Sequence, residues 1–314
     1  MELIIKNLSK TYANGVKALK NVNLTMGKGM FGLLGQNGAG KSTLMRTVAT
    51  LQDADSGSVT FDGVNVTREP DQLRRILGYL PQEFGVYPSA TATELLTHIA
   101  DMKGITQPGE RKDQVEALLK RVNLWDVRNK KLGGYSGGMK QRFGIAQALL
   151  GQPKLIIVDE PTAGLDPMER NRFYNLLAEI GENTVVILST HIVEDVSTLC
   201  NQMAIIGKGE VLLTGSPNDV EEALRGQVWE KQIEKEELAA YEDRLNVISS
   251  RFHLGKMLIT VAADNLPDGG FWAKVPNLED AYFYELKKQE QAFRSTSNNS
   301  ESLFNSQQVA AENN

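Results

Sequence analysis

The sequence predicts an α/β fold with a parallel sheet, an antiparallel β part, an inserted helical subdomain and a small C-terminal α+β extension. Two short runs, 155–158 and 185–188, are wholly apolar, as expected of central parallel strands that are covered on both faces. A glycine-rich loop over 35–43 follows a third apolar run, 30–34, which predicts a strand that feeds a helix through the loop. Helical periodicity dominates the segment from about 84 to 150, which we interpret as the inserted subdomain.

Length and composition are those of an ordinary globular protein. The chain has 314 residues, of which 41% are hydrophobic, and this suffices for a buried core in one large domain or two modest ones. We predict a first domain over 1–225 and an accessory domain over 226–290. The remaining residues, 291–314, are rich in Ser, Asn and Gln and are expected to form a disordered tail.

Charge and cysteine content argue against several classes of protein. A net charge of -5 disfavours binding of nucleic acid through bulk electrostatics. The single cysteine, Cys200, cannot form an intramolecular disulfide and suits a reducing compartment. No run approaches the roughly 18 apolar residues of a membrane helix, and the N-terminus lacks a leader pattern. We therefore expect a cytosolic protein whose membrane role, if it has one, comes through a partner.

The chain before the inserted helical segment should consist mainly of strands. In chain order we expect strands over 3–6, 18–26 and 30–34, a helix over 44–51, and strands over 57–61 and 76–80. The Asp62-Gly63 pair predicts a hairpin turn after 57–61. Tyr12 lies between the first two strands, where it either stacks on a purine ring or covers the core, and its spacing does not decide between the two.

The glycine-rich loop matches the phosphate-binding pattern G-x-x-x-x-G-K-[ST]. Its glycines let successive backbone N–H groups converge on a phosphate, and the following helix adds its positive end. Lys41 is placed to reach the outer phosphates, and the Ser42 hydroxyl is placed to ligate the bridging Mg²⁺. A chance glycine-rich turn is the alternative, which the preceding strand disfavours. The predicted nucleotide contacts are Gly35, Asn37, Gly38, Ala39, Gly40, Lys41, Ser42 and Thr43.

Three helices are expected in the inserted segment. Thr91 and Glu94 form a capping box for the first helix, and an apolar stripe over 115–122 marks the second. Ser136 is the expected N-cap of a third helix that runs to about residue 150. Gly137 and Gly138 leave backbone N–H groups bare at its start, which predicts a second anion site; an irregular helix entrance is the alternative.

Two adjacent carboxylates, Asp159 and Glu160, end the apolar strand over 155–158. Sheets of α/β proteins bind ligands at this edge, and alternating side-chain directions allow the two residues different roles. One can hold a metal and its water shell while the other polarises an attacking water. The alternative, a solvated acidic loop, is disfavoured by the buried strand.

The remaining elements follow in order. Asp166 should cap a helix that starts at Pro167 and ends at Gly181. His191 follows the strand over 185–188 and either contacts a γ-phosphate or is structural. Further on, we expect a hairpin of 203–206 with 210–213, strands at 247–248 and 257–259, and a closing helix over 277–286.

The order of these motifs resembles the ATP-binding subunit of ABC transporters over residues 1 to about 225. The matching segments are the phosphate loop, 81–83, 135–139, 155–160, 163–166 and Thr190-His191. The resemblance implies a P-loop NTPase fold of the ABC ATPase type that binds ATP and Mg²⁺. It also implies roles for six residues: Tyr12 stacks on adenine, Gln82 contacts magnesium and water and reports to the permease, Asp159 is metal-associated, Glu160 is the general base, His191 senses the γ-phosphate, and Asp166 lies in the dimer-contacting loop.

The signature segment departs from the commonest family pattern, Leu-Ser-Gly-Gly-Gln. Tyr135 replaces the leucine and Met139 replaces the glutamine. Met139 lacks the amide group with which the glutamine of the family makes a contact on the ribose side. Ser136, Gly137 and Gly138, which carry the phosphate contacts in the family, are intact. The Tyr-Ser-Gly-Gly-Met version resembles the branch of separate ATPase subunits that serve drug, sodium, lipid or polysaccharide exporters.

This resemblance implies a head-to-tail dimer with a second copy or a paralogous subunit. ATP on the phosphate loop of one subunit is capped by Ser136 and its two glycines from the other, and closure drives a transmembrane permease. The expected location is the inner face of the cell membrane, through the permease, with export favoured over import. The permease is expected to dock near Gln82 and the segment 84–89.

Three other functions compete with this interpretation. An ATP-dependent mechanical or regulatory module on a membrane complex, without transport, stays open. A ribosome- or DNA-remodelling ATPase is disfavoured by the single cassette, the absence of sustained heptads and the acidic balance. A simple P-loop kinase leaves Ser136 and Asp166 without a purpose.

Overall fold

The computed structural model describes residues 1–82, 85–162, 165–267 and 269–293. Within them the chain forms two compact units, Met1–Ser216 and the described residues from Pro217 onward. The division lies before the predicted boundary at 225, so that helix α8 (Pro217–Glu222) belongs to the second unit. The greater part of the predicted tail, 294–314, lies outside the described residues.

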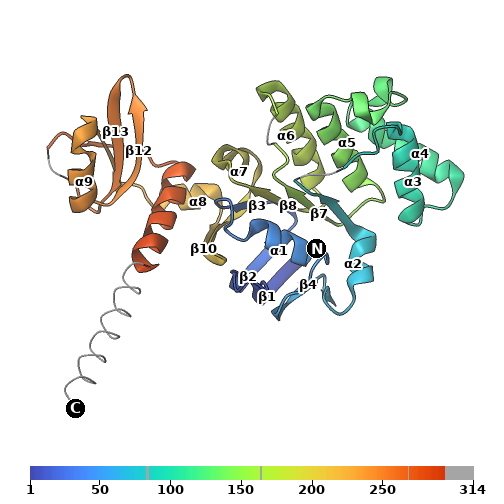
Figure 1. Ribbon diagram of the computed structural model, residues 1–314, viewed down its shortest axis with the longest axis horizontal. Coiled ribbons are helices and arrows are strands. Elements are labelled where there is room, and N and C mark those ends of the chain that lie inside the picture. Colours follow the sequence, from blue (N-terminus) through green and yellow to red (C-terminus); the bar gives the residue numbers. More distant parts are fainter. Residues whose placement is uncertain (83–84, 163–164, 268, 294–314) are drawn as a thin grey trace, which may run out of the picture. The chain divides into compact units, whose positions relative to one another are not determined.

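A six-stranded sheet forms the centre of the first unit, with strand order β10-β9-β3-β8-β7-β6 (Figure 1). Neighbours from β9 to β6 pair in parallel, and β10 pairs antiparallel with β9. The strands are β3 (Gly29–Leu34), β6 (Leu77–Leu80), β7 (Leu155–Asp159), β8 (Val185–Thr190), β9 (Gln202–Gly207) and β10 (Glu210–Gly215). Strands β7 and β8 are buried along their whole length, which confirms the prediction from the two apolar runs.

A four-stranded antiparallel sheet lies on one face of the central sheet. It has the order β2-β1-β4-β5, from β1 (Glu2–Thr11), β2 (Lys17–Gly27), β4 (Ser56–Phe61) and β5 (Val64–Asn65). The predicted turn between β4 and β5 is confirmed, with Asp62 and Gly63 both at positive φ. Helix α1 (Lys41–Val48) buries Leu44, Met45 and Val48 in a core shared by the two sheets, which anchors the start of α1.

Helices cover the opposite face of the central sheet. They include α3 (Ala92–Met102), α4 (Pro108–Arg121) and α5 (Gly137–Leu149), and α5 packs against β6 (Figure 1). The predicted capping box is confirmed, because the Thr91 hydroxyl accepts from the Glu94 N–H and the Glu94 carboxylate accepts from the Thr91 N–H. Short 3-10 turns over Trp125–Val127 and Leu132–Gly134 connect α4 to α5.

Three further helices complete the first unit, and the sequence pattern predicted one of them. Helix α6 (Pro167–Gly181) has the bounds that Asp166, Pro167 and Gly181 predicted. The helices α2 (Pro70–Ile76) and α7 (Val193–Leu199) were missed, since each is two turns long and buries too few side chains to show a periodicity.

The second unit is a small α+β domain. Its sheet has the order β12-β13-β11-β14, from β11 (Val228–Ile233), β12 (Val247–His253), β13 (Lys256–Ala262) and β14 (Trp272–Ala273). A short 3-10 turn (Lys235–Glu237), helix α9 (Leu238–Arg244) and a helix over 278–293 accompany the sheet. The predicted strands near 247 and 257 and the closing helix are confirmed, whereas β11 was missed. No helix in the described part of the chain is long and apolar enough to cross a membrane.

Candidate functional site

The glycine-rich loop lies between β3 and α1, at the carboxyl edge of the central sheet. Gly40 has φ 109°, and a Cβ atom on it would lie 2.5 Å from the Ala18 carbonyl oxygen. A side chain is therefore excluded at this position without a backbone shift. The neighbouring hairpin turn steadies the loop, because the Gly209 N–H donates to the Ala39 carbonyl at 2.9 Å.

Lys41 is the first residue of α1, and its side chain is 4% exposed. Its ammonium group donates to the Gly35 carbonyl at 2.7 Å and to the Gln36 carbonyl at 3.2 Å, and it lies 3.6 Å from Glu160 Oε1. Burial lowers the pKa of Lys41, while the charges of Glu160 and Asp159 act in the opposite direction. The loop thus holds a cation directly beneath its own backbone.

Two polar side chains at strand ends meet the carboxylate of Glu160, which follows the strand between them. Gln82 comes after β6, Glu160 after β7 and His191 after β8, which are adjacent in the central sheet. Gln82 Nε2 donates to Glu160 Oε2 at 3.1 Å, and His191 Nδ1 lies 3.2 Å from Glu160 Oε1. Glu160 itself has φ 48°, so the chain turns sharply off the end of β7. The structure therefore brings together the four residues that were predicted to be catalytic, Lys41 included.

Asp159 supplies a buried acceptor beside this cluster. It is 3% exposed, and its Oδ1 atom has no hydrogen-bond partner among the described residues. A buried carboxylate oxygen is costly in that state unless a ligand satisfies it. Asp159 and the Ser42 hydroxyl that lines the cleft described below offer oxygen ligands, which suit Mg²⁺. Within the described ranges no group of three or more His, Cys, Asp or Glu side chains forms a protein-only metal site, so phosphate and water oxygens would have to complete the coordination.

A cleft of about 750 Å³ contains the phosphate loop, Gln82 and Glu160. This volume suits a ligand of nucleotide size. Tyr12 lines the cleft with its hydroxyl 3.1 Å from Thr43 Oγ1, and 39% of it is exposed. The core-covering interpretation of Tyr12 is therefore wrong. Lys208 also lines the cleft, from the turn between β9 and β10, and was missed because a Gly-Lys-Gly turn has no distinctive pattern.

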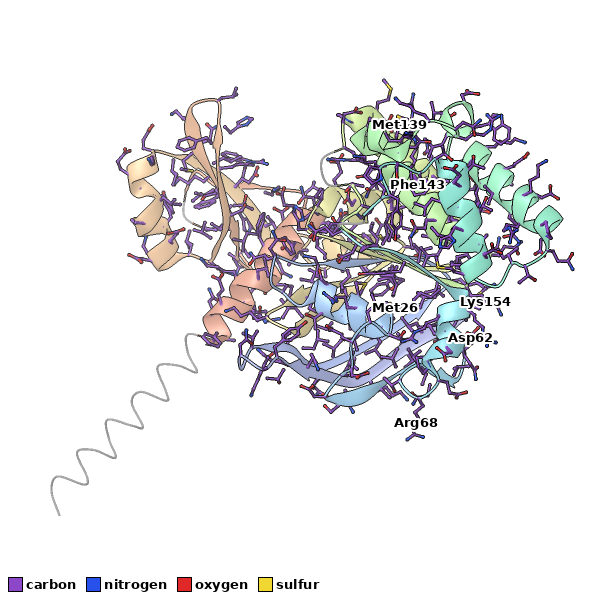
Figure 2. All side chains as sticks on the ribbon, turned by 45° about the vertical axis from the view of Figure 1, so that its right-hand side comes forward. Met26, Asp62, Arg68, Met139, Phe143 and Lys154 are labelled. Atoms are coloured by element: carbon purple, nitrogen blue, oxygen red, sulfur yellow. The ribbon has the colours of Figure 1, made fainter. Side chains whose placement is uncertain are left out.

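The second predicted anion site is not part of this cleft. Ser136 caps α5 as predicted, since its hydroxyl accepts from the Met139 N–H at 3.2 Å. None of Ser136, Gly137, Gly138 and Met139 lines the cleft. Figure 2 shows Met139 on α5, across the central sheet from Asp62 of the antiparallel part. The exposed start of α5 is thus available to another molecule.

The first turn of α6 lies beside α5. The Asp166 carboxylate caps α6 by accepting from the Glu169 N–H at 2.8 Å, and Glu169 pairs with Arg142 of α5 at 2.5 Å. Parts of two predicted segments lie outside the described residues: Glu83 and Phe84 of the expected permease-docking region, and Ala163 and Gly164 of the dimer-contacting loop.

Comparison with known proteins gives a consistent result. A family model described as ABC transporter matches residues 19–163. The ABC transporter ATP-binding protein NatA of Bacillus subtilis is 37% identical over 68% of this chain and 87% of its own length. The linearmycin resistance ATP-binding protein LnrL of the same organism is 38% identical over 70% and 71%. The daunorubicin/doxorubicin resistance ATP-binding protein DrrA of Streptomyces peucetius is 34% identical over 76% and 72%.

A solved structure gives the same result at the level of the fold. The dimeric, post-hydrolysis state of the ATP-binding cassette MJ0796 with ADP and Pi superposes with a TM-score of 0.63 at 29% identity. The match covers 68% of this chain and 98% of that one.

Proposed function

Since this chain belongs to the ABC transporter family as an ATP-binding subunit that hydrolyses ATP, we propose that it powers a transporter whose permease is a separate membrane protein. The observation that carries the proposal is the meeting of Lys41, Gln82, Glu160 and His191 at the edge of three neighbouring strands. Lys41, Gln82 and Glu160 line the cleft that also contains the phosphate loop. Each residue then has a role that its contacts support.

We assign the nucleotide to the cleft with its triphosphate on the loop 35–43. The backbone N–H groups of this loop and the ammonium of Lys41 hold the phosphates, and Tyr12 stacks on the base. Mg²⁺ would be held by Ser42, Asp159 and Gln82, and it would neutralise charge on the phosphates. The unpartnered Asp159 Oδ1 supports this donor set.

Glu160 is the proposed general base. In the arrangement described here its Oε1 atom faces Lys41 and His191, and its Oε2 atom accepts from Gln82. When Lys41 pairs with phosphate instead, the Glu160 Oε1 atom is released to accept a hydrogen bond from the attacking water. It can then take a proton from the attacking water while His191 contacts the γ-phosphate.

A second molecule is proposed to complete the site. Ser136, Gly137 and Gly138 are the family's second phosphate-binding group, yet they do not line the cleft of their own chain. In a head-to-tail dimer with a second copy or a paralogue, the start of α5 of one subunit caps ATP on the other, with Asp166 and Met139 at the contact. The dimeric state of the similar MJ0796 cassette supports this arrangement.

Export is the proposed direction, because two relatives are named as resistance proteins for linearmycin and for daunorubicin and doxorubicin. The chain would then sit in the cytoplasm on the inner face of the membrane, held there by the permease. Docking near Gln82 is proposed because this residue links the end of β6 to the hydrolysis site and precedes the helical segment.

The variant Glu160→Gln tests the proposed base. The amide preserves the shape of the carboxylate but cannot accept the proton, so steady-state turnover should fall by roughly 100-fold or more while ATP affinity is retained. Phosphate release and nucleotide binding measure the two quantities. Glu179→Gln, which removes a carboxylate from a surface ion pair with Arg121, is the matched control and should keep normal turnover. Unchanged turnover of Glu160→Gln would remove Glu160 as the base.

A further inference from the structure

We propose that Asp195, a buried residue of α7, is a positioning residue for ATP hydrolysis. It ties the loop that carries His191 to the segment that leads from Glu160 towards Asp166, and so fixes His191 against Glu160. The inference rests on the proposed roles of Glu160 and His191.

Asp195 accepts hydrogen bonds from three hydroxyl groups on three separate segments. Its Oδ2 atom accepts from Thr162 Oγ1 at 2.7 Å and from Thr190 Oγ1 at 2.8 Å. Its Oδ1 atom accepts from the Tyr174 hydroxyl of α6 at 2.5 Å. Burial raises the pKa of Tyr174 well above its ordinary value, and the bond to Asp195 adds to this, so the phenol remains a donor.

Burial of the Asp195 carboxylate has a high desolvation free energy, which a purely structural contact would not require. Asp195 is 0% exposed, and among the described residues no Lys, Arg or His forms an ion pair with it. A buried carboxylate without a cationic partner has a large desolvation penalty, which hydroxyl donors offset only in part. The carboxylate thus gives geometric definition more than net stability, which is the property that a hydrolysis site requires.

The network brackets the contact between His191 and Glu160 on both sides. On one side, Thr190 precedes His191, and its Oγ1 both donates to Asp195 and accepts from the Ile192 N–H at 2.9 Å. On the other side, Thr162 is two residues after Glu160 and donates to the same Asp195 oxygen. The Glu160 N–H already donates to the Ser189 carbonyl at 2.8 Å, and Asp195 adds a second link between the two segments beyond the strand ends. This second link lies next to the 3.2 Å contact between His191 Nδ1 and Glu160 Oε1.

The variant Asp195→Asn tests the proposal, because the amide has the same size but replaces an acceptor with a donor that faces other donors. We expect kcat to fall about 10-fold, a loss of about 1.4 kcal/mol in transition-state stabilisation. The Kd for ATP should change less than about twofold, because the bond that joins the phosphate loop to this network runs from the Gly35 N–H to the Thr190 backbone carbonyl, at 3.3 Å, and does not involve Asp195. Phosphate release and nucleotide binding give the two values. Turnover equal to that of the unaltered protein would overturn the proposal.

A second pair of variants keeps the test valid if Asp195→Asn fails to fold. Thr162→Val replaces one donor hydroxyl with a methyl group and should lower kcat, whereas Thr162→Ser keeps the hydroxyl and should restore it. Thr97→Val is the matched control: it makes the same change on α3, where the Thr97 hydroxyl donates to the Thr93 carbonyl. Equal turnover of Thr162→Val and Thr162→Ser would contradict the proposal.

A double-mutant cycle separates positioning from general destabilisation. If Asp195 acts through His191, then adding Asp195→Asn to His191→Ala should lower kcat by less than about twofold, against about 10-fold in the unaltered background. Fully additive losses would mean that Asp195 is only structural, and the proposal would fail. Failure of the proposed function would give a different result from failure of the Asp195 proposal. In that case His191→Ala and Glu160→Gln would both retain full turnover.

Discussion

Gly40 illustrates how single residues shape the phosphate loop. Both Gly38 and Gly40 have positive φ, at 80° and 109°, but only Gly40 has a close neighbour. A Cβ atom on Gly40 would lie 2.5 Å from the backbone oxygen of Ala18, whereas a Cβ atom on Gly38 would meet nothing within 4 Å. A methyl group should therefore destabilise the protein more at position 40 than at position 38.

We predict that Gly40→Ala destabilises the nucleotide-free protein more than Gly38→Ala. Each alanine has a backbone cost of roughly 1–2 kcal/mol for its positive φ, and at Gly40 the strand β2 must also shift to remove the contact. Thermal unfolding without nucleotide measures both variants. Equal melting temperatures for the two would contradict the close packing of Gly40 against Ala18.

At the scale of elements, Lys103 fastens the end of α3 to its neighbours. Its ammonium donates to the Leu150 carbonyl, just after α5, at 2.7 Å and lies 3.4 Å from the Leu77 carbonyl of β6. Burial lowers the pKa of Lys103 from 10.5 to about 8. The helical segment is thus joined to the central sheet through a group that titrates near neutral pH.

This shift predicts a pH dependence of stability. Between pH 8 and 10.5 the unfolded chain binds more protons at this lysine than the native chain, so its contribution to the free energy of unfolding rises with pH across that window. The difference between the unaltered protein and Lys103→Met in urea unfolding should therefore grow in favour of the unaltered protein from about pH 8 upward. Lys112→Met removes an exposed lysine of α4 and should show no such trend. A constant difference for Lys103→Met would mean that the ammonium is well hydrated.

At the scale of the whole molecule, the proposed dimer depends on a surface that its own chain does not use. A Cβ atom on Gly137 would meet nothing within 4 Å, so a side chain can start there without a clash at its Cβ atom. Gly138 differs, because its Cβ atom would lie 2.8 Å from Glu169 Oε2. Gly137 is therefore the better position for a test of assembly.

We predict that Gly137→Trp abolishes steady-state ATP turnover but leaves ATP binding by the single subunit within a few-fold, since the indole would stand where the partner's nucleotide must lie. Gly109→Trp, at an equally open position in the first turn of α4, should retain turnover. Phosphate release across a range of protein concentrations, with binding measured in parallel, checks both. Undiminished turnover of Gly137→Trp would exclude the composite site.

Sequence features that act over a few residues predicted much of this fold, and the order of the motifs identified the main site residues. The cap at Asp166 with Pro167 gave the start of α6, and the apolar runs gave β7 and β8, because these features act within a few residues. The positions of Gln82, Glu160 and His191 at strand ends came from motif order, and their contacts required the parallel pairing of β6, β7 and β8.

The sequence did not predict β11 or the role of Asp195, because their buried charged residues are stabilised by partners far along the chain. Strand β11 carries Glu230 on a buried face, where Lys274, far along the chain, neutralises it at 3.4 Å. Asp195 follows Glu194 in a pair that looks solvated, and its three hydroxyl partners come from separate segments. Neither residue has a neighbour in sequence that marks it as buried.

The left-handed backbone of Glu160 has a consequence for how this protein can change. A glutamate with φ 48° is held in a conformation that glycine or asparagine adopts more readily. Selection for thermal robustness would favour those smaller residues at this position, whereas selection for hydrolysis retains the carboxylate. The two pressures oppose each other at one peptide unit, so the most heat-resistant descendants of this chain need not be the most active ones.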